Sequence, residues 1–172
     1  QMAVDAFLQD NMNDALKWAK ELIEKETNVT DHKTEAYYLC AQAYYQLHQY
    51  PQTVEQINLY QQQPNIAQSE NQKTAIYLKA YALFNQKQYT TAEPIFREYI
   101  SQLTNNTEDN TYADALTRLG DCLFHERHFQ EACNTYTQVA KLNGYGADYA
   151  LLQSGYAQGL MHQDEEKVET LT

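Results

Sequence analysis

The stretch LTRLGDCLFHERHFQEACNTY, residues 116–136, decides the fold. Its first half carries apolar or small residues at i, i+3, i+4 and i+7, namely Leu116, Leu119, Gly120 and Leu123. That spacing places them on one face of an α-helix. A short polar break follows, and Phe129, Ala132 and Tyr136 then mark the apolar face of a second helix. The stretch therefore predicts a helical hairpin.

The same pattern occurs twice more upstream. One copy contains Tyr37, Cys40, Ala41, Tyr44, Tyr50, Thr53 and Ile57, and the other contains Ile76, Lys79, Ala80, Leu83, Tyr89, Ala92 and Phe96. The sequence position rises by 39 from Ala41 to Ala80 and by 40 from Ala80 to Gly120. The second helices give the same two spacings. Because two independent sets of positions share one period, we predict an array of three hairpins.

Polar segments and helix-start signals separate these helices. Pro51 stands where a first-turn proline costs no hydrogen bond, and Ser69-x-x-Gln72 and Thr90-x-x-Glu93 read as capping boxes. Polar segments at 27–33, 61–69, 104–110 and 142–147 are expected to be loops or frayed helix ends.

The repeated pattern resembles the tetratricopeptide repeat. The third copy matches it best, with Leu119-Gly120 at the family's Leu-Gly and Ala132-x3-Tyr136 at its Ala-x3-Phe. No copy has the family's opening Trp, and the period is longer by five or six than the family's usual one. The resemblance implies an all-α, right-handed α–α superhelix, a solenoid of helical hairpins in one domain over residues 1–172. Its predicted repeats are at about 31–69, 70–109 and 110–146, with partial repeats at 1–30 and 147–172.

The two end segments match only parts of further repeats. Met12, Ala15 and Ala19 fit the bend and second helix of an earlier repeat, and a later repeat would include Leu151, Gly155, Val168 and Leu171. Because stacked arrays normally end in polar caps, we expect a piece of a longer repeat protein. Its uncapped apolar ends would allow a homo-oligomer to form.

A local similarity bears on the source and compartment. The segment DYALLQ at 148–153, with the GL and EKVETL that follow, is similar to repeats of large bacterial tetratricopeptide proteins, some linked to the cell envelope. An odd number of cysteines fits a reducing cytoplasm better. The compartment therefore stays open between a bacterial envelope or periplasm and the cytoplasm.

Small residues recur where paired helices would come closest, at Ala41, Ala80, Ala92, Gly120 and Ala132. Helices pack at roughly 8 to 10 Å only when short side chains lie at the crossing, so we expect these residues to be buried there. The cysteines Cys40, Cys122 and Cys133 have no CxxC spacing and fall at apolar helix positions. They are expected to be buried core residues, although Cys122 and Cys133 could approach each other across a hairpin.

Charge and motifs exclude several functions. Twelve Lys and Arg against 23 Asp and Glu give a net charge of −11, whereas nucleic-acid binding relies on clustered basic residues. Apolar runs are far shorter than the ~20 residues of a membrane span, so we predict no membrane insertion. The motifs GxxxxGK, GxGxxG, GxSxG and HExxH do not occur. We therefore predict a non-enzyme without a cofactor.

One group of residues has the types that transition metals prefer. Asp121, His125 and His128 would share one helical face. They fall where the first helix ends and a solvated bend begins, and no second shell is evident. We therefore predict no metal site.

Residues beside the packing stripe of the first helices are the candidates for binding. In arrays of hairpins these helices line the concave side, and the candidates are Tyr38, Gln42, Tyr45, Tyr77, Tyr81, Phe84, Arg118, Asp121, Phe124 and Tyr156, with Thr117, Leu152 and Gln153 beside them. Tyrosine is amphipathic and loses little entropy when fixed, so a peptide or protein segment is the expected guest. Tyrosine also fills spaces between hairpins, and about half of these rings are expected to pack instead.

The chemistry of the guest follows from charge. Relatives that hold a C-terminal carboxylate use Lys, Arg and Asn on this face, where this chain has Tyr38, Gln42, Leu78, Asp114 and Arg118. Only Arg118 matches, so the acidic chain is expected to favour a neutral or basic segment. Our first hypothesis is a non-catalytic protein-interaction module that acts as a scaffold. The alternatives are a structural spacer or self-association element of a larger repeat protein, and an accessory domain of an enzyme.

Overall fold

The computed structural model of the chain describes residues 2–26, 28, 30–64, 66, 69–103, 110–142, 144 and 146–170, with side chains described between residues 11 and 162. Helices and short turns account for these residues, and no strand occurs among them. The predicted all-α class is confirmed. The helices form two compact units, Gln1–Lys87 and Gln88–Thr172, and each unit is described by itself.

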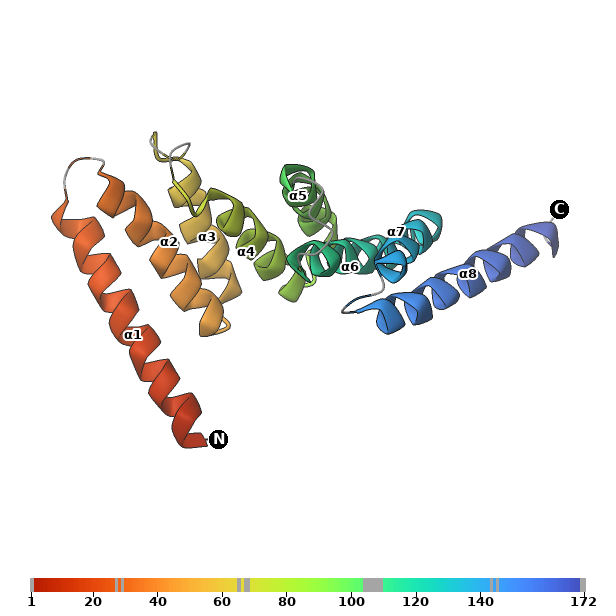
Figure 1. Cartoon of the computed structure of the whole chain (residues 1–172), viewed down its shortest axis with the longest axis horizontal. Helices are drawn as coiled ribbons and strands as arrows, with labels where there is room; N and C mark the ends of the chain where they lie inside the picture. The colour runs from red at the N-terminus through yellow and green to blue at the C-terminus, as the bar shows by residue number, and fades with distance from the viewer. Residues whose placement is uncertain are drawn as a thin grey trace. The chain divides into compact units, whose positions relative to one another are not determined.

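Unit 1 contains four helices, α1 (Met2–Lys25), α2 (Asp31–Gln46), α3 (Tyr50–Gln61) and α4 (Gln72–Asn85). Each helix packs against the next in sequence, and α2 also contacts α4 (Figure 1). Leu16 and Ala19 of α1 share a buried cluster with Ala36, Cys40 and Ala43 of α2. The opposite side of α2 packs against α3 and α4. Helix α2 is therefore covered on two sides.

Unit 2 also contains four helices, α5 (Tyr89–Gln102), α6 (Asn110–His125), α7 (Phe129–Lys141) and α8 (Ala147–Thr170). Again each helix packs against its neighbour in sequence. Leu116, Leu119 and Leu123 of α6 are buried, as the spacing predicts. The division between the units falls inside the predicted repeat 70–109, so pairing of α4 with α5 stays a prediction.

The bends of the hairpins repeat with the sequence. His48, Lys87 and Arg127 have left-handed backbones, with φ of 57°, 58° and 64°, and successive bends differ by 39 and 40 in sequence position. The N–H of Gln49 donates to the carbonyl of Tyr44 at 2.8 Å, and that of His128 donates to Leu123 at 2.9 Å. These are the 6→1 bonds of a Schellman motif, which closes a helix and turns the chain.

Helix starts follow the predictions only in part. Pro51 lies in the first turn of α3, as predicted. The two capping boxes are wrong, because α4 begins after Asn71 and α5 after Gln88, neither with a side-chain cap. At α2, the side chain of Thr30 caps the helix by accepting the N–H of Lys33 at 3.0 Å.

The predicted polar segments are shorter than expected where the structure describes them. Helices already begin at Asp31, Asn110 and Ala147, so the ends of the segments 27–33, 104–110 and 142–147 are helical. Residues 104–109 lie outside the described residues.

The expected bends in the end segments are also wrong. Helix α1 runs without interruption through Met12, and α8 continues from Ala147 to Thr170. No Pro or left-handed residue interrupts the described part of either helix. Each of these segments is one long helix and not the hairpin that the repeat pattern suggested.

The small residues are buried, as predicted. Ala41, Ala80, Ala92 and Ala132 are fully buried. At Gly120 of α6, a Cβ atom would lie 2.6 Å from Cε1 of Tyr136 on α7. Real Cβ contacts are essentially never that short, so any side chain at position 120 would require the Tyr136 ring to shift. Cys40, Cys122 and Cys133 are buried free thiols, which confirms their expected place in the core.

Candidate functional site

A row of aromatic side chains follows α4 in unit 1. The ring centroids of Tyr77 and Tyr81 lie 4.9 Å apart and those of Tyr81 and Phe84 lie 6.4 Å apart, each edge-on or tilted. All three side chains are half-buried. Tyr45 of α2 joins this row, because its hydroxyl accepts a bond from Asn85 at 3.4 Å. We call Tyr45, Tyr77, Tyr81 and Phe84 the aromatic row.

Two other predicted residues of α2 lie differently. Tyr38 is only 4% exposed, and its ring packs 5.7 Å from that of Tyr60. Burial raises the pKa of the Tyr38 hydroxyl, which accepts a hydrogen bond from Gln42 at 3.0 Å. Tyr38 is therefore a packing residue and not part of the candidate binding surface. Gln42 is exposed.

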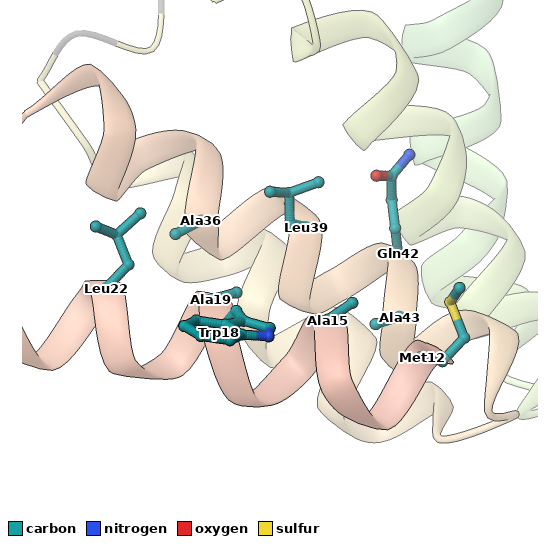
Figure 2. Close-up of a pocket in the computed structure, with 9 residues that line it drawn as sticks. All are labelled: Met12, Ala15, Trp18, Ala19, Leu22, Ala36, Leu39, Gln42 and Ala43. Atoms are coloured by element: carbon teal, nitrogen blue, oxygen red, sulfur yellow. The ribbon is translucent and has the colours of Figure 1, made fainter. Parts of the chain in front are cut away.

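A separate groove opens between α1 and α2. It has a volume of about 370 Å³, and its residues come from both helices (Figure 2): Met12, Ala15, Trp18, Ala19, Leu22, Ala36, Leu39, Gln42 and Ala43. All but Gln42 are apolar. Trp18 and Leu39 are 69% and 51% exposed. Apolar pockets with few polar groups are typical binding sites.

Sequence reasoning missed this α1/α2 groove. The apolar spacing of Met12, Ala15 and Ala19 was interpreted as helix packing. Leu39 lies outside the predicted packing face of α2. The signal that could have found the groove is Trp18, the single tryptophan of the chain, one residue before the buried Ala19. A large apolar residue beside a packing stripe widens the apolar face beyond what one neighbouring helix covers.

In unit 2 the predicted residues Arg118 and Asp121 form part of a buried polar cluster. Asp121 is 5% exposed and accepts bonds from the hydroxyls of Tyr136 and Tyr149, each at 2.8 Å. Arg118 donates to its other oxygen at 2.5 Å. A buried carboxylate with three donors has its hydrogen bonds satisfied. Asp121 therefore links α6 to α7 and α8 and is not part of the candidate binding surface.

The carboxylate changes the acidity of its neighbours. Burial first, and then the charge of Asp121, raise the pKa of Tyr149 to about 12. The same two causes raise the pKa of the Cys122 thiol to about 12 and also raise the pKa of Tyr136. A thiol with such a pKa is protonated and unreactive at neutral pH. The cluster therefore offers no nucleophile.

The two histidines do not join Asp121 in a metal site. The ring of His125 stacks on Tyr89 at 4.1 Å, and His128 precedes α7 beside Glu126, with an Nδ1–Oε2 distance of 3.6 Å. Among the described residues, no group of three or more His, Cys, Asp or Glu side chains could hold a metal ion.

The remaining predicted residues of unit 2 lie on two helices. Phe124 is half-buried, with its ring 5.5 Å from that of Phe129. Tyr156 on α8 is 57% exposed. Thr117 is buried and donates to the carbonyl of Ala113. Because the predicted residues belong to two separate units, the continuous face that they were expected to form stays a prediction.

Successive helical hairpins with small residues at their crossings define an α-helical repeat fold. The family model of the tetratricopeptide repeat matches this chain at residues 74–103 and 114–143. The chain thus contains two segments that match the tetratricopeptide repeat. Repeats of this kind are generally protein–protein interaction modules, and their fold is typically non-catalytic.

Solved structures agree with this fold. The chain is similar to the TPR-like repeats of a Podosopora anserina protein named as a putative kinesin light chain, with a TM-score of 0.69 and 14% identity over 98% of this chain and 89% of that chain. For a substituted variant of those repeats, the TM-score is 0.70 and the sequence identity is 15%. That match covers 98% of this chain and 88% of that chain. A comparison with curated proteins gave no match.

The structure also bears on membrane insertion. Within the described residues, none of the helices combines the length and apolar character needed to cross a bilayer.

Proposed function

We propose that this chain is a non-catalytic protein-interaction module whose aromatic row binds a neutral or basic peptide segment. The observation that supports it most is the arrangement of Tyr77, Tyr81 and Phe84. Their rings contact one another edge-on or tilted along one helix while remaining half-exposed. Rigid, amphipathic rings of this kind supply contact area at a small entropic cost.

The charge of the chain favours the same class of guest. With a net charge of −11, an acidic segment would be repelled at long range, whereas a basic one would be attracted. The hydroxyl of Tyr45 within the row and the amide of Asn85 beside it add polar groups that can bond to a peptide backbone. Gln42, Arg118, Phe124 and Tyr156 are further contact residues of the proposal, each within its own unit.

The test is binding of a panel of fluorescent peptides of equal length and graded charge. We expect neutral and basic peptides to bind the chain more tightly than acidic ones. Tyr81→Ala should weaken the best binder by about 2 kcal/mol, or about 30-fold in Kd, as a central aromatic contact does.

A matched control is Tyr112→Ala, which removes a half-buried tyrosine from α6 in unit 2. It should leave the Kd unchanged. Equal losses in Tyr81→Ala and Tyr112→Ala, or preferential binding of acidic peptides, would contradict the proposed surface.

A second candidate function is self-association, the alternative role as a structural element. The exposed apolar groove between α1 and α2 and the exposed leucines of α8 are the specific observations that favour it.

A further inference from the structure

The α1/α2 groove has a filled counterpart within unit 1. One repeat later, α3 and α4 form the equivalent pair, and α2 packs over them. Tyr38 and Ala41 of α2 share a buried cluster with Ile57, Tyr60 and Ala75, and Tyr37 and Leu78 pack against it. Ala75 and Leu78 stand one repeat after Ala36 and Leu39 of the groove. In the repeat pattern, the α1/α2 groove is therefore the place where the first helix of a repeat would pack, as α2 packs on α3 and α4.

Helix α8 has the pattern of such a first helix. Three repeats after Ala36, Cys40 and Ala43 of α2, it places Ala150, Ser154 and Ala157 at the same relative spacing. Both sets are buried and pack onto the preceding helix. On α8, Ala157 clusters with Phe129 and Cys133, and Ser154 is 3.2 Å from the sulfur of Cys133.

The other face of α8 is open. In the same alignment, Leu151, Leu152 and Gly155 correspond to Tyr37, Tyr38 and Ala41, the face with which α2 covers α3 and α4. Leu151 and Leu152 are 61% and 55% exposed. A Cβ added at Gly155 would meet nothing within 4 Å. This face has the residues of a packing surface and no cover among the described residues.

We propose that α8 of one copy of this chain occupies the α1/α2 groove of a second copy. The contact reproduces the way α2 covers α3 and α4. Leu151 and Leu152 would fill the apolar space beside Trp18 and Leu39, and Gly155 would let the helices approach closely. The contact buries exposed apolar surface on both sides, which supplies its free energy.

The geometry of this contact is head to tail. Groove and α8 face are different surfaces of one chain, so every copy can use both at once. Such heterologous contacts build rings or open chains of copies and not a two-fold dimer. The interface shares Gln42 with the proposed peptide surface but uses neither Tyr77 nor Tyr81, so Tyr81→Ala should weaken peptide binding and leave the association unchanged.

Charge modulates the association. Residues 11–25 of α1 hold three acidic side chains, Asp14, Glu21 and Glu24, and three lysines, Lys17, Lys20 and Lys25. This part of α1 is therefore neutral, whereas the whole chain carries −11. Salt screens the repulsion between copies, so association should strengthen as salt rises.

The experiment is sedimentation velocity of the chain at increasing concentration. We expect the mass to rise above 20.0 kDa with concentration. Leu39→Glu in the groove and Leu151→Glu on α8 should each remain monomeric, because each places a charge in the apolar contact. A chain that stays monomeric throughout, even at high salt, overturns the proposal.

Mixing the two variants distinguishes this interface from others. The Leu39→Glu copy keeps an intact α8, and the Leu151→Glu copy keeps an intact groove. Their equimolar mixture should form a dimer of one copy each and nothing larger. If the mixture stays monomeric, or if either variant alone still associates like the unaltered chain, the head-to-tail contact is wrong.

Matched controls exclude effects of charge or misfolding. Gln52→Glu on α3 and Gln138→Glu on α7 add the same charge at exposed positions and should associate like the unaltered chain. Loss of association in these controls would overturn the proposal. Far-UV circular dichroism checks the helices of each variant, and if Leu39→Glu unfolds, Trp18→Ser replaces it as the groove variant.

Discussion

The hairpins α2/α3 and α6/α7 reach the same packing with different residue pairs. Ala41 of α2 shares a buried cluster with Ile57 of α3, whereas the equivalent positions two repeats later, on α6 and α7, hold Gly120 and Tyr136. A larger residue on the second helix goes with a smaller one on the first. In these two hairpins, a change of size on one helix is therefore matched by the opposite change on the other.

A second difference lies next to that pair. Gln42 and Ala43 of α2 correspond to Asp121 and Cys122 of α6. Gln42 is exposed, whereas Asp121 is buried under Arg118 and two tyrosine hydroxyls. Unit 2 therefore contains an ionisable cluster at a place where α2 of unit 1 has an exposed amide and an alanine.

The greatest effect should be a loss of stability at alkaline pH. The pKa of Cys122 is raised from 9.0 to about 12, and that of Tyr149 from 10.0 to about 12. Above pH 9 the unfolded chain releases the thiol proton while the folded chain keeps it, so the free energy of unfolding falls. Cys122 alone should account for about 3 kcal/mol at pH 11, measured by denaturant unfolding at pH 8, 9.5 and 11.

The matched variant for this prediction is Cys122→Ala, which installs the residue found at the equivalent position 43. It should lose less stability between pH 8 and 11 than the unaltered chain. A variant with the same alkaline loss would show that the thiol is not its cause.

An overpacked crossing should have the next largest effect. In Gly120→Leu the new side chain would collide with the ring of Tyr136, and we expect a loss of about 1 to 3 kcal/mol in the free energy of unfolding. The control is Gly159→Leu on α8, where a Cβ meets nothing within 4 Å. That change should stabilise the helix by up to ~1 kcal/mol. Losses of equal size at both glycines would argue against the crossing.

Exchange of the crossing pair, Gly120 and Tyr136, should have the smallest effect on the free energy of unfolding. It tests most specifically whether the two residues share one crossing. Gly120→Ala together with Tyr136→Ile would give α6/α7 the pair found in α2/α3. We expect the double variant to be about 1 kcal/mol more stable than the sum of the single losses predicts. Strict additivity in thermal or denaturant unfolding would mean that the two residues do not share the crossing.

Much of this architecture could be predicted because packing imposes a period on the sequence. The spacing of Ala41, Ala80 and Gly120 predicts three hairpins, and the burial of these residues is confirmed. The capping box at Thr90 fails because the bend at Lys87 starts α5 already at Tyr89, and the one at Ser69 fails because α4 begins only at Gln72. The bends themselves have residues such as His48 in left-handed conformations, where a glycine would have been the signal.

The candidate site was harder to predict. Tyr38 and Tyr77 are equivalent in sequence, yet Tyr38 is buried and Tyr77 only half-buried, because Tyr60 packs against the ring of Tyr38. Periodicity gives the face of a helix, but not whether a neighbour's side chain covers it. The α1/α2 groove depends on two helices from successive parts of the chain, so Trp18 and Leu39 carry no joint signal in sequence.

The most direct test of the repeated close crossing is a nuclear Overhauser measurement between the α-protons of Gly120 and the ring protons of Tyr136. We predict a strong cross-peak and ring-current shifts of the glycine protons, because the ring lies against the α6 backbone. Assigned resonances without a cross-peak would contradict the hairpin packing on which the repeat and its binding surfaces depend.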